Sequence, residues 1–239
     1  MKITKTYLIL LLGSIFLYSL NAQADGDLSL SLGVKLLGAN WSGHNQNSDT
    51  DFSAGGTQFG LNAALQKGRF YTGLNLQSGE YTFDDNAPDQ VSKSGSQSYS
   101  NVKIKHSEVD LIAGYFFWKH ISLFLDIKGF GNQWDNNDYK LGFSGIGLGA
   151  SGMWPLSKRW SLYGSFGFVP SGKLEANNEK IGSGSSAAIE FGSIFSFNAS
   201  NRLTLGLKQQ SRTYKFDSGD QQEHKMNGIF LGYSHLFLY

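Results

Sequence analysis

Apolar residues alternate with polar or small residues along most of the chain. In the segment 28–36, leucine and valine side chains alternate with serine, glycine and lysine. The same period of two returns in nine further segments, which are 59–66, 70–77, 109–117, 121–131, 144–154, 160–168, 187–197, 203–209 and 229–239. Because successive side chains of a strand face opposite sides, each segment predicts a β-strand with one apolar face. The sequence therefore predicts an all-β protein with ten strands.

The connections between these segments also alternate, in length. Four are tight, at 67–68, 118–120, 155–159 and 198–201, and the other five are mostly long and polar, at 41–55, 84–101, 133–138, 174–183 and 217–223. Short turns at one end and longer loops at the other are typical of outer-membrane barrels with an even strand number. A closed barrel leaves no unpaired strand edge in lipid. We therefore predict a closed antiparallel transmembrane β-barrel, an up-and-down meander of ten strands.

Aromatic residues cluster near both ends of the predicted strands. One group lies beside the tight turns or the C-terminus and comprises Phe70, Phe117, Trp118, Trp154, Trp160, Phe197, Phe237 and Tyr239. The other lies at the opposite strand ends and comprises Trp41, Tyr81, Phe83, Trp134, Tyr139, Tyr214 and Phe216. Since Trp and Tyr rings prefer the headgroup level, we expect two outward-facing aromatic belts.

The first residues resemble a secretory signal. Lys2 and Lys5 precede an apolar run of 14 residues at 7–20, and Ala22-Gln23-Ala24 offers a cleavage site. The run is shorter than the roughly 20 residues of a spanning helix. We therefore expect residues 1–24 to be a signal peptide and 25–239 to form a single barrel domain. The absence of Cys excludes disulfides and Cys-ligated metals, and a net charge of +1 gives no reason to expect a nucleic-acid partner.

The last segment, Tyr233–Tyr239, alternates apolar residues and closes on an aromatic one. In this it resembles the C-terminal assembly signal of bacterial outer-membrane β-barrel proteins, with Tyr in place of their usual final Phe. The resemblance implies a Gram-negative outer membrane and recognition of the C-terminal strand by the barrel-assembly machinery. We expect a monomer whose termini and tight turns face the periplasm.

A soluble sandwich or lipocalin-like barrel is the competing fold. Such a barrel would bury its apolar residues, so its other face would be the wetted surface and should be richly charged. Instead that face is mainly Gly, Ser, Asn and Gln. The pattern favours a barrel whose apolar face contacts lipid.

With the apolar face outward, eight charged residues should line the lumen. They are Lys35, Glu108, Asp110, Asp126, Lys128, Glu190, Lys208 and Arg212. The tight turn at 118–120 predicts that Asp110 lies directly opposite Lys128. If Phe197 lies opposite Leu203, Glu190 is diagonal to Lys208 and to Arg212. Such charges either form a structural ion network in a filled barrel or line a narrow channel for small polar or ionic solutes, for which inward glycines could leave room.

A second set of charges is expected outside. Alternation places five lysines on the outward face just below the long loops: Lys103, Lys105, Lys140, Lys215 and Lys225. Their ammonium groups would suit the phosphates of lipopolysaccharide. The long loops are rich in Asp and Glu, which we interpret as solvated charge because no spacing matches a calcium loop.

Catalytic and metal-binding signals are sparse. No two of the five His have metal-ligand spacing, so we expect no metal, no cofactor and no catalytic residues. One hydrolase alternative remains, because Asp84-Asp85 and Glu223-His224 could meet across the mouth and activate water. The chain is similar in strand count and in these residue types to the omptin proteases, whose acid–His pair has a spacer that is lacking here.

Three functions follow, in order of preference. The first is a non-enzymatic surface barrel with lipopolysaccharide contacts and a lumen largely filled by side chains. The second is a narrow porin-like channel, and the third is an omptin-like surface hydrolase.

Overall fold

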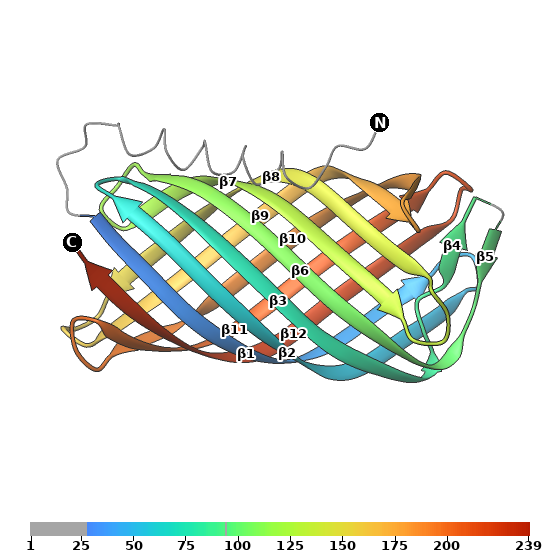
Figure 1. Ribbon diagram of the computed structural model, residues 1–239, viewed down its shortest axis with the longest axis horizontal. Coiled ribbons are helices and arrows are strands. Elements are labelled where there is room, and N and C mark those ends of the chain that lie inside the picture. The colour runs from blue at the N-terminus through green and yellow to red at the C-terminus, as the bar shows by residue number, and fades with distance from the viewer. Residues whose placement is uncertain (1–27, 94) are drawn as a thin grey trace.

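A closed barrel forms the main body of the computed structural model, which describes residues 28–93 and 95–239. Ten antiparallel strands follow one another around its wall as an up-and-down meander, and β1 pairs with β12 to close it (Figure 1). Two further strands, β4 and β5, form a small separate hairpin between β3 and β6. The predicted fold class and the ten strands of the barrel are confirmed. The predicted signal peptide lies outside the described residues.

The barrel strands are 14 to 18 residues long. Their bounds are β1 Leu28–Asn45, β2 Thr50–Lys67, β3 Phe70–Asn86, β6 Ser100–Phe116, β7 Ile121–Trp134, β8 Lys140–Pro155, β9 Trp160–Ala176, β10 Glu179–Ser196, β11 Asn201–Phe216 and β12 Gln221–Leu238. The small hairpin consists of β4 Gln90–Ser92 and β5 Gly95–Gln97. We call the barrel end that carries this hairpin the hairpin end, and the opposite one, where Leu28 and Tyr239 lie, the terminal end.

Several connections are much shorter than the sequence suggested. The expected loop 41–55 is a turn of residues 46–49, and the expected loop 174–183 is the two-residue turn Asn177-Asn178. Both asparagines have left-handed backbones, with φ of 49° and 71°, which is the conformation of a type I′ hairpin turn. Asn adopts this conformation more readily than most residues. The polar residues that were predicted to form loops therefore belong to the strands, which extend beyond the apolar region.

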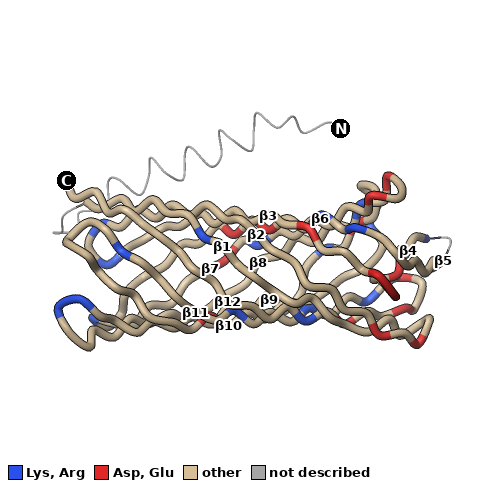
Figure 2. The backbone as a smooth tube through the Cα atoms, turned by 90° about the horizontal axis from the view of Figure 1, so that it is seen from below, with Lys and Arg blue, Asp and Glu red and all other residues tan. Residues whose placement is uncertain are grey.

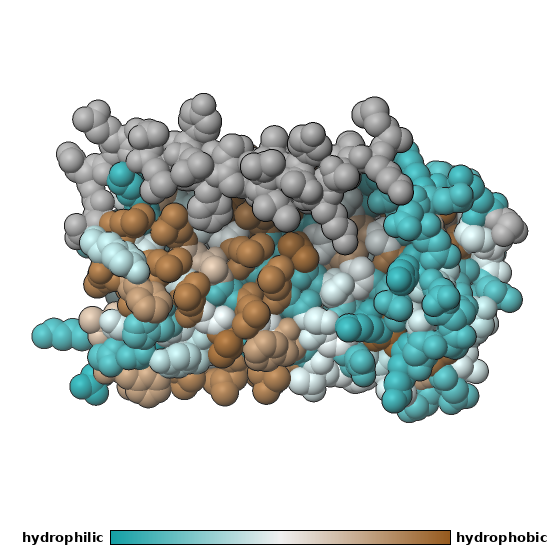
Figure 3. Space-filling view, viewed as in Figure 1, coloured by the Kyte–Doolittle hydropathy of each residue, from teal (hydrophilic) through white to brown (hydrophobic). Residues whose placement is uncertain are grey.

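The terminal half of the barrel has an apolar outer surface (Figure 3). On β8 the outward side chains Ile146 and Leu148 are 66% and 58% exposed, and Leu205 on β11 is 54% exposed. On β12 the outward apolar residues run from Ile229 to Phe237, close to the nine to eleven residues that a tilted membrane strand needs. The belt of exposed aromatic side chains at the turns of this end agrees with the sequence prediction. We call this outer surface the apolar band.

The hairpin half has the opposite polarity, with apolar side chains inside and polar side chains outside. The predicted second aromatic belt is therefore wrong. All its members are buried in the barrel interior: Trp41, Tyr81, Phe83, Trp134, Tyr139, Tyr214 and Phe216. Above the lipid, water wets the outer wall, so apolar groups are stabilised by turning inward. Residues 37–45 of β1 lie in this half. From the rise and tilt of barrel strands, they extend about 20 Å beyond the apolar band along the barrel axis.

Within the described ranges, the structure has no helix of the length and apolar character needed to cross a membrane.

Candidate functional site

A layer of charged side chains crosses the lumen between the two halves of the barrel. It contains the eight residues that alternation placed inside, of which five are buried and three, Lys35, Asp110 and Glu190, are partly exposed. Neighbouring strands position them because every second residue of a strand faces the lumen. Four acidic and four basic groups balance one another: Glu108, Asp110, Asp126 and Glu190 against Lys35, Lys128, Lys208 and Arg212. We call this set the charge layer.

Glu108 of β6 is the centre of the charge layer. Its carboxylate lies 3.1 Å from the Lys128 ammonium and 3.2 Å from the Lys208 ammonium, and 3.7 Å from the Arg212 guanidinium. The Gln210 amide also donates a hydrogen bond to Glu108. Three cations from β7 and β11 thus converge on one buried carboxylate, so strands on different sides of the barrel are joined through it.

The β6–β7 side of the layer follows the register read from the sequence. Asp110 is the direct cross-strand partner of Lys128, and their side chains form an ion pair. Asp126 lies 3.8 Å from the same ammonium group but has no hydrogen-bond partner for its Oδ1 atom. Lys128 is therefore shared among Glu108 and these two aspartates.

The β10–β11 hairpin differs from the predicted register. Leu203 lies opposite Phe195 and not Phe197, so Glu190 is directly opposite Lys208 and Arg212 is opposite Ser186. Glu190 of β10 instead forms its ion pair with Lys35 of β1, past β11 and β12 in the barrel wall, with the ammonium at 2.8 Å. The cause is a tighter turn, in which the Asn198 side chain accepts hydrogen bonds from the backbone at residues 200 and 201.

A polar cavity of about 130 Å³ adjoins the charge layer on its terminal side. Lys35, Asn62, Asn75, Asp126 and Glu190 are among the residues that line it. Several of these side chains are partly exposed, whereas the layers above are closed. Solvent therefore reaches the charge layer from the terminal end.

Packed aromatic side chains close the lumen above the charge layer. Arg212 joins the two layers, because its guanidinium stacks 3.7 Å from the centre of the Phe130 ring. Higher up, Trp41 is fully buried and donates a hydrogen bond from its indole Nε1 to Nδ1 of His224. Its ring contacts Tyr81 and Phe83 edge-on, at centroid distances of 5.2 and 5.4 Å. We call the apolar residues buried in this half the aromatic plug.

The connection after β3 folds over the hairpin end as a cap. Its segment 87–92 is largely buried, and the amide nitrogen of Asn45 donates a hydrogen bond to the backbone carbonyl of Ala87. The Tyr139 hydroxyl accepts a hydrogen bond from the Val91 backbone N–H and donates one to its carbonyl. Gln222 binds the backbone carbonyl of Asp89. The cap is therefore attached to β1, to β12 and to the β7–β8 connection.

We expect this cap to open at alkaline pH. Burial raises the pKa of the Tyr139 hydroxyl above its ordinary value of about 10, so the attached cap favours the neutral phenol. The stability from this group is complete below about pH 10 and is lost as the pH rises further. Limited proteolysis with subtilisin should cleave segment 87–92 faster above pH 10.

The variant Tyr139→Phe should make the cap sensitive at neutral pH, because removing two hydrogen bonds costs about 1–3 kcal/mol. Tyr99→Phe is the matched control, since the Tyr99 hydroxyl donates its hydrogen bond to the exposed Gln97 side chain. Equal cleavage of the two variants would contradict this role of Tyr139.

The five predicted rim lysines lie on the outer wall of the hairpin half. Lys103, Lys105, Lys140, Lys215 and Lys225 are all exposed. Figure 2 shows the acidic residues concentrated at the hairpin end, beyond the apolar band. The lysines therefore stand between the apolar band and an acidic rim.

The structure brings together part of the hydrolase alternative: Asp85 and Glu223 line one hollow on the outer wall, whereas His224 lies inside the barrel. His224 is buried in the aromatic plug, whereas Glu223 beside it faces outward, because neighbouring strand residues point to opposite faces. Asp84 and Asp85 are exposed on β3. In residues 28–93 and 95–239, no three His, Asp or Glu side chains are grouped so that they could hold a metal ion.

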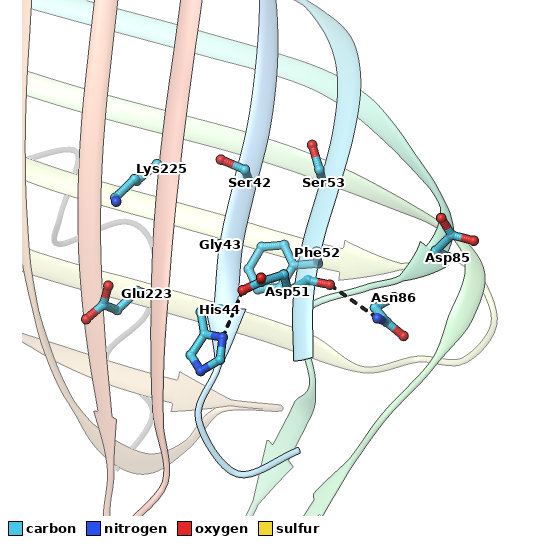
Figure 4. Close-up of a pocket in the computed structure, with 10 residues that line it drawn as sticks. All are labelled: Ser42, Gly43, His44, Asp51, Phe52, Ser53, Asp85, Asn86, Glu223 and Lys225. Atoms are coloured by element: carbon cyan, nitrogen blue, oxygen red, sulfur yellow. Dashed lines mark hydrogen bonds and ion pairs between the residues drawn. The ribbon is translucent and has the colours of Figure 1, made fainter. Parts of the chain in front are cut away.

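The hollow that Asp85 and Glu223 share has a volume of about 530 Å³ and lies on the outer wall near the hairpin end (Figure 4). Its side chains come from the ends of β12, β1, β2 and β3 and include His44, Asp51, Asp85 and Glu223. His44 Nδ1 lies 2.9 Å from a carboxylate oxygen of Asp51. The Asp51 side chain is 89% exposed and the His44 side chain 41%, so solvent reaches this pair.

Comparison with known proteins shows the fold and no closer relationship. No family model and no curated protein matches the sequence. The outer membrane protease OmpT from Escherichia coli has a similar structure, with a TM-score of 0.54 and 11% identity over 90% of this chain and 98% of that one. The toluene transporter TodX from Pseudomonas putida gives 0.34 and 10%, over 90% and 91%. The likeness to OmpT shows that the chain has the fold of bacterial outer-membrane β-barrel proteins.

Proposed function

We propose that this protein is a non-conducting and non-enzymatic surface barrel of the outer membrane. The observation that carries the proposal is the double closure of the lumen, by the charge layer and by the aromatic plug above it. An ion crossing the barrel would have to separate buried ion pairs and then pass through packed rings. Both steps are costly, since an unpaired buried charge is destabilised by several kcal/mol.

The distribution of charge supports an orientation with both termini in the periplasm. The terminal turns carry basic residues, such as Lys119 and Arg159, and the hairpin end is acidic (Figure 2). With the termini in the periplasm, the rim lysines face the phosphate groups of lipopolysaccharide outside. The C-terminal strand β12 then contacts the barrel-assembly machinery before it closes on β1. A monomer is sufficient for this arrangement, since the barrel closes with its own strands.

A hydrolytic function has less support. The one histidine of the predicted mouth site, His224, accepts a hydrogen bond from Trp41 inside the plug. Its other ring nitrogen, Nε2, lies 3.3 Å from the Gln222 side chain. A general base has to reach a substrate, and this imidazole is enclosed.

Planar lipid bilayers test the proposal. We expect no conductance steps when the purified full-length barrel is added at amounts that give many steps with a trimeric porin. Heat-modifiable mobility on gels should show in parallel that the added protein is folded. Reproducible steps that scale with folded protein would contradict the closed lumen and favour the narrow channel.

A further inference from the structure

We propose that a groove on the outer wall, across β6, β7 and β8, binds the phosphorylated sugar headgroup of an outer-leaflet lipid. The headgroup phosphate would be held between Lys105 and Lys140. This inference rests on the proposed function, because it assigns the general lipopolysaccharide contact to one site.

The strand register places the two lysines on either side of one position. Lys105 of β6 is the direct partner of Gln133 of β7, and Gln133 is the direct partner of Lys140 of β8. All three side chains face outward. With strands about 4.8 Å apart, the lysine Cα atoms are separated by roughly 10 Å. Two flexible ammonium groups at this spacing can contact one phosphate, and the Gln133 amide between them can donate a further hydrogen bond.

Neither of these two ammonium groups is held in an ion pair in the described residues, although the exposed Glu80 of β3 is the direct cross-strand partner of Lys105. Across residues 28–93 and 95–239, no carboxylate lies within 4.0 Å of Lys105 or Lys140, whereas Lys93 and Lys173 pair with Glu179 and Glu175. Glu175 also borders the groove, but its carboxylate already accepts the Lys173 ammonium. The groove therefore offers net positive charge to an anion.

Below the lysines, the wall is hollowed by small residues. Ser107, Gly131 and Gly142 form the next outward row across the same three strands, and the groove has a volume of about 330 Å³. A Cβ atom added at Gly142 would meet nothing closer than 3.9 Å. The floor is thus a flat stretch of sheet with almost no side chains, which leaves room for a sugar ring.

The groove leads directly to the apolar band. The following rows bring Val109 on β6 and then Ile127 on β7 and Ile146 on β8 to the outer surface, all of them exposed. In a phosphorylated glycolipid, the phosphate would lie at the lysines, the sugar on the glycine floor and the acyl chains on the apolar side chains. This sequence of surfaces favours a phosphorylated glycolipid over free phosphate.

The test measures binding of diphosphoryl lipid A to the full-length barrel in nonionic detergent. The variant Lys105→Gln/Lys140→Gln should bind about thirtyfold more weakly, equivalent to about 2 kcal/mol for two lysines at 1.4 kcal/mol per tenfold change. The matched control is Lys215→Gln/Lys225→Gln. It removes the same charge from rim positions whose neighbours across the sheet include Ser183, Ser211 and Ser42. Because Lys215 and Lys225 belong to the rim but not to the groove, this pair should lose clearly less binding than Lys105→Gln/Lys140→Gln.

A second pair of variants tests the groove independently of charge. Gly142→Leu fills the floor and leaves both lysines, so we expect a similar loss of binding. Gly38→Leu is its control, since Gly38 on β1 also faces open space but lies away from the groove. Dephosphorylated lipid A should bind weakly to the wild type and to every variant. Inorganic phosphate should compete poorly with diphosphoryl lipid A.

The outcomes separate this site from the general function. Equal loss in both lysine pairs would overturn the groove while leaving a diffuse lipopolysaccharide contact in place. If replacing all five rim lysines by Gln caused no loss of lipid A binding, both the groove and the general lipopolysaccharide contact would be overturned. Strong competition by inorganic phosphate would mean that the site is one for a free anion.

Discussion

The variant Glu108→Gln is expected to lower the free energy of unfolding by about 3–5 kcal/mol, the usual cost of removing one partner from a buried ion pair. Glutamine keeps the volume of the side chain but not its charge. Within the described part of the chain, Lys208 and Arg212 would then have no carboxylate within 4.0 Å. Lys128 would keep Asp110 and, at a longer distance, Asp126.

Guanidinium unfolding in detergent micelles, followed by tryptophan fluorescence, measures this effect. Glu80→Gln is the matched control, because Glu80 is exposed on the outer face of β3 and should change stability by less than about 0.5 kcal/mol. The double variant Glu108→Gln/Lys208→Gln should recover part of the loss, since one unpaired charge is removed. A Glu108→Gln barrel as stable as the wild type would contradict the central role of this carboxylate.

The second large effect is expected from Trp41→Ala in the aromatic plug. Removing this fully buried ring leaves a cavity between Tyr81 and Phe83 and deprives His224 of its hydrogen-bond donor. Replacing a buried Trp by Ala typically costs about 3–5 kcal/mol. Because Trp41 lies beyond the apolar band, we expect the hairpin half to become sensitive to protease while the membrane-embedded strands remain folded.

Trp118→Ala is the natural control, since Trp118 is 67% exposed in the aromatic belt of the terminal end. Its loss should change stability by about 1 kcal/mol or less and leave the hairpin half resistant to protease. The variant Trp41→Phe should fall between the two. Cleavage that begins in the terminal turns of the Trp41→Ala protein would be inconsistent with an independently packed plug.

Both predictions rest on a change of environment along the barrel axis. In the terminal half, lipid surrounds the wall, so charged and small residues face the lumen. In the hairpin half, water surrounds the wall, so aromatic residues face the lumen and pack as in a soluble barrel. The charge layer lies at the boundary, where Arg212 contacts both Glu108 and the Phe130 ring.

The sequence contained a signal for this change that the period-two pattern alone did not reveal. Leu36 and Leu37 follow one another on β1, and the structure shows the first exposed and the second buried. From Leu37 onward the apolar positions fall in the opposite phase, which includes Trp41. The sequence prediction has all aromatic residues near the strand ends forming outward-facing belts. It therefore places the aromatic residues of this second phase on the outer face, whereas they face the lumen. A shift of one residue exchanges the two faces of a strand.

Alternation by itself determined the all-β class, the ten barrel strands and the pairing of Asp110 with Lys128, because these depend on a local period and on one tight turn. Only the tertiary structure decided where each strand ends, that Lys35 pairs with Glu190 across the closing strands, and that the hairpin half is packed inside. The physical reason is that a period of two sorts side chains onto two faces. Which face is enclosed depends on the surrounding solvent and on closure of the barrel, and neither is written in a local repeat.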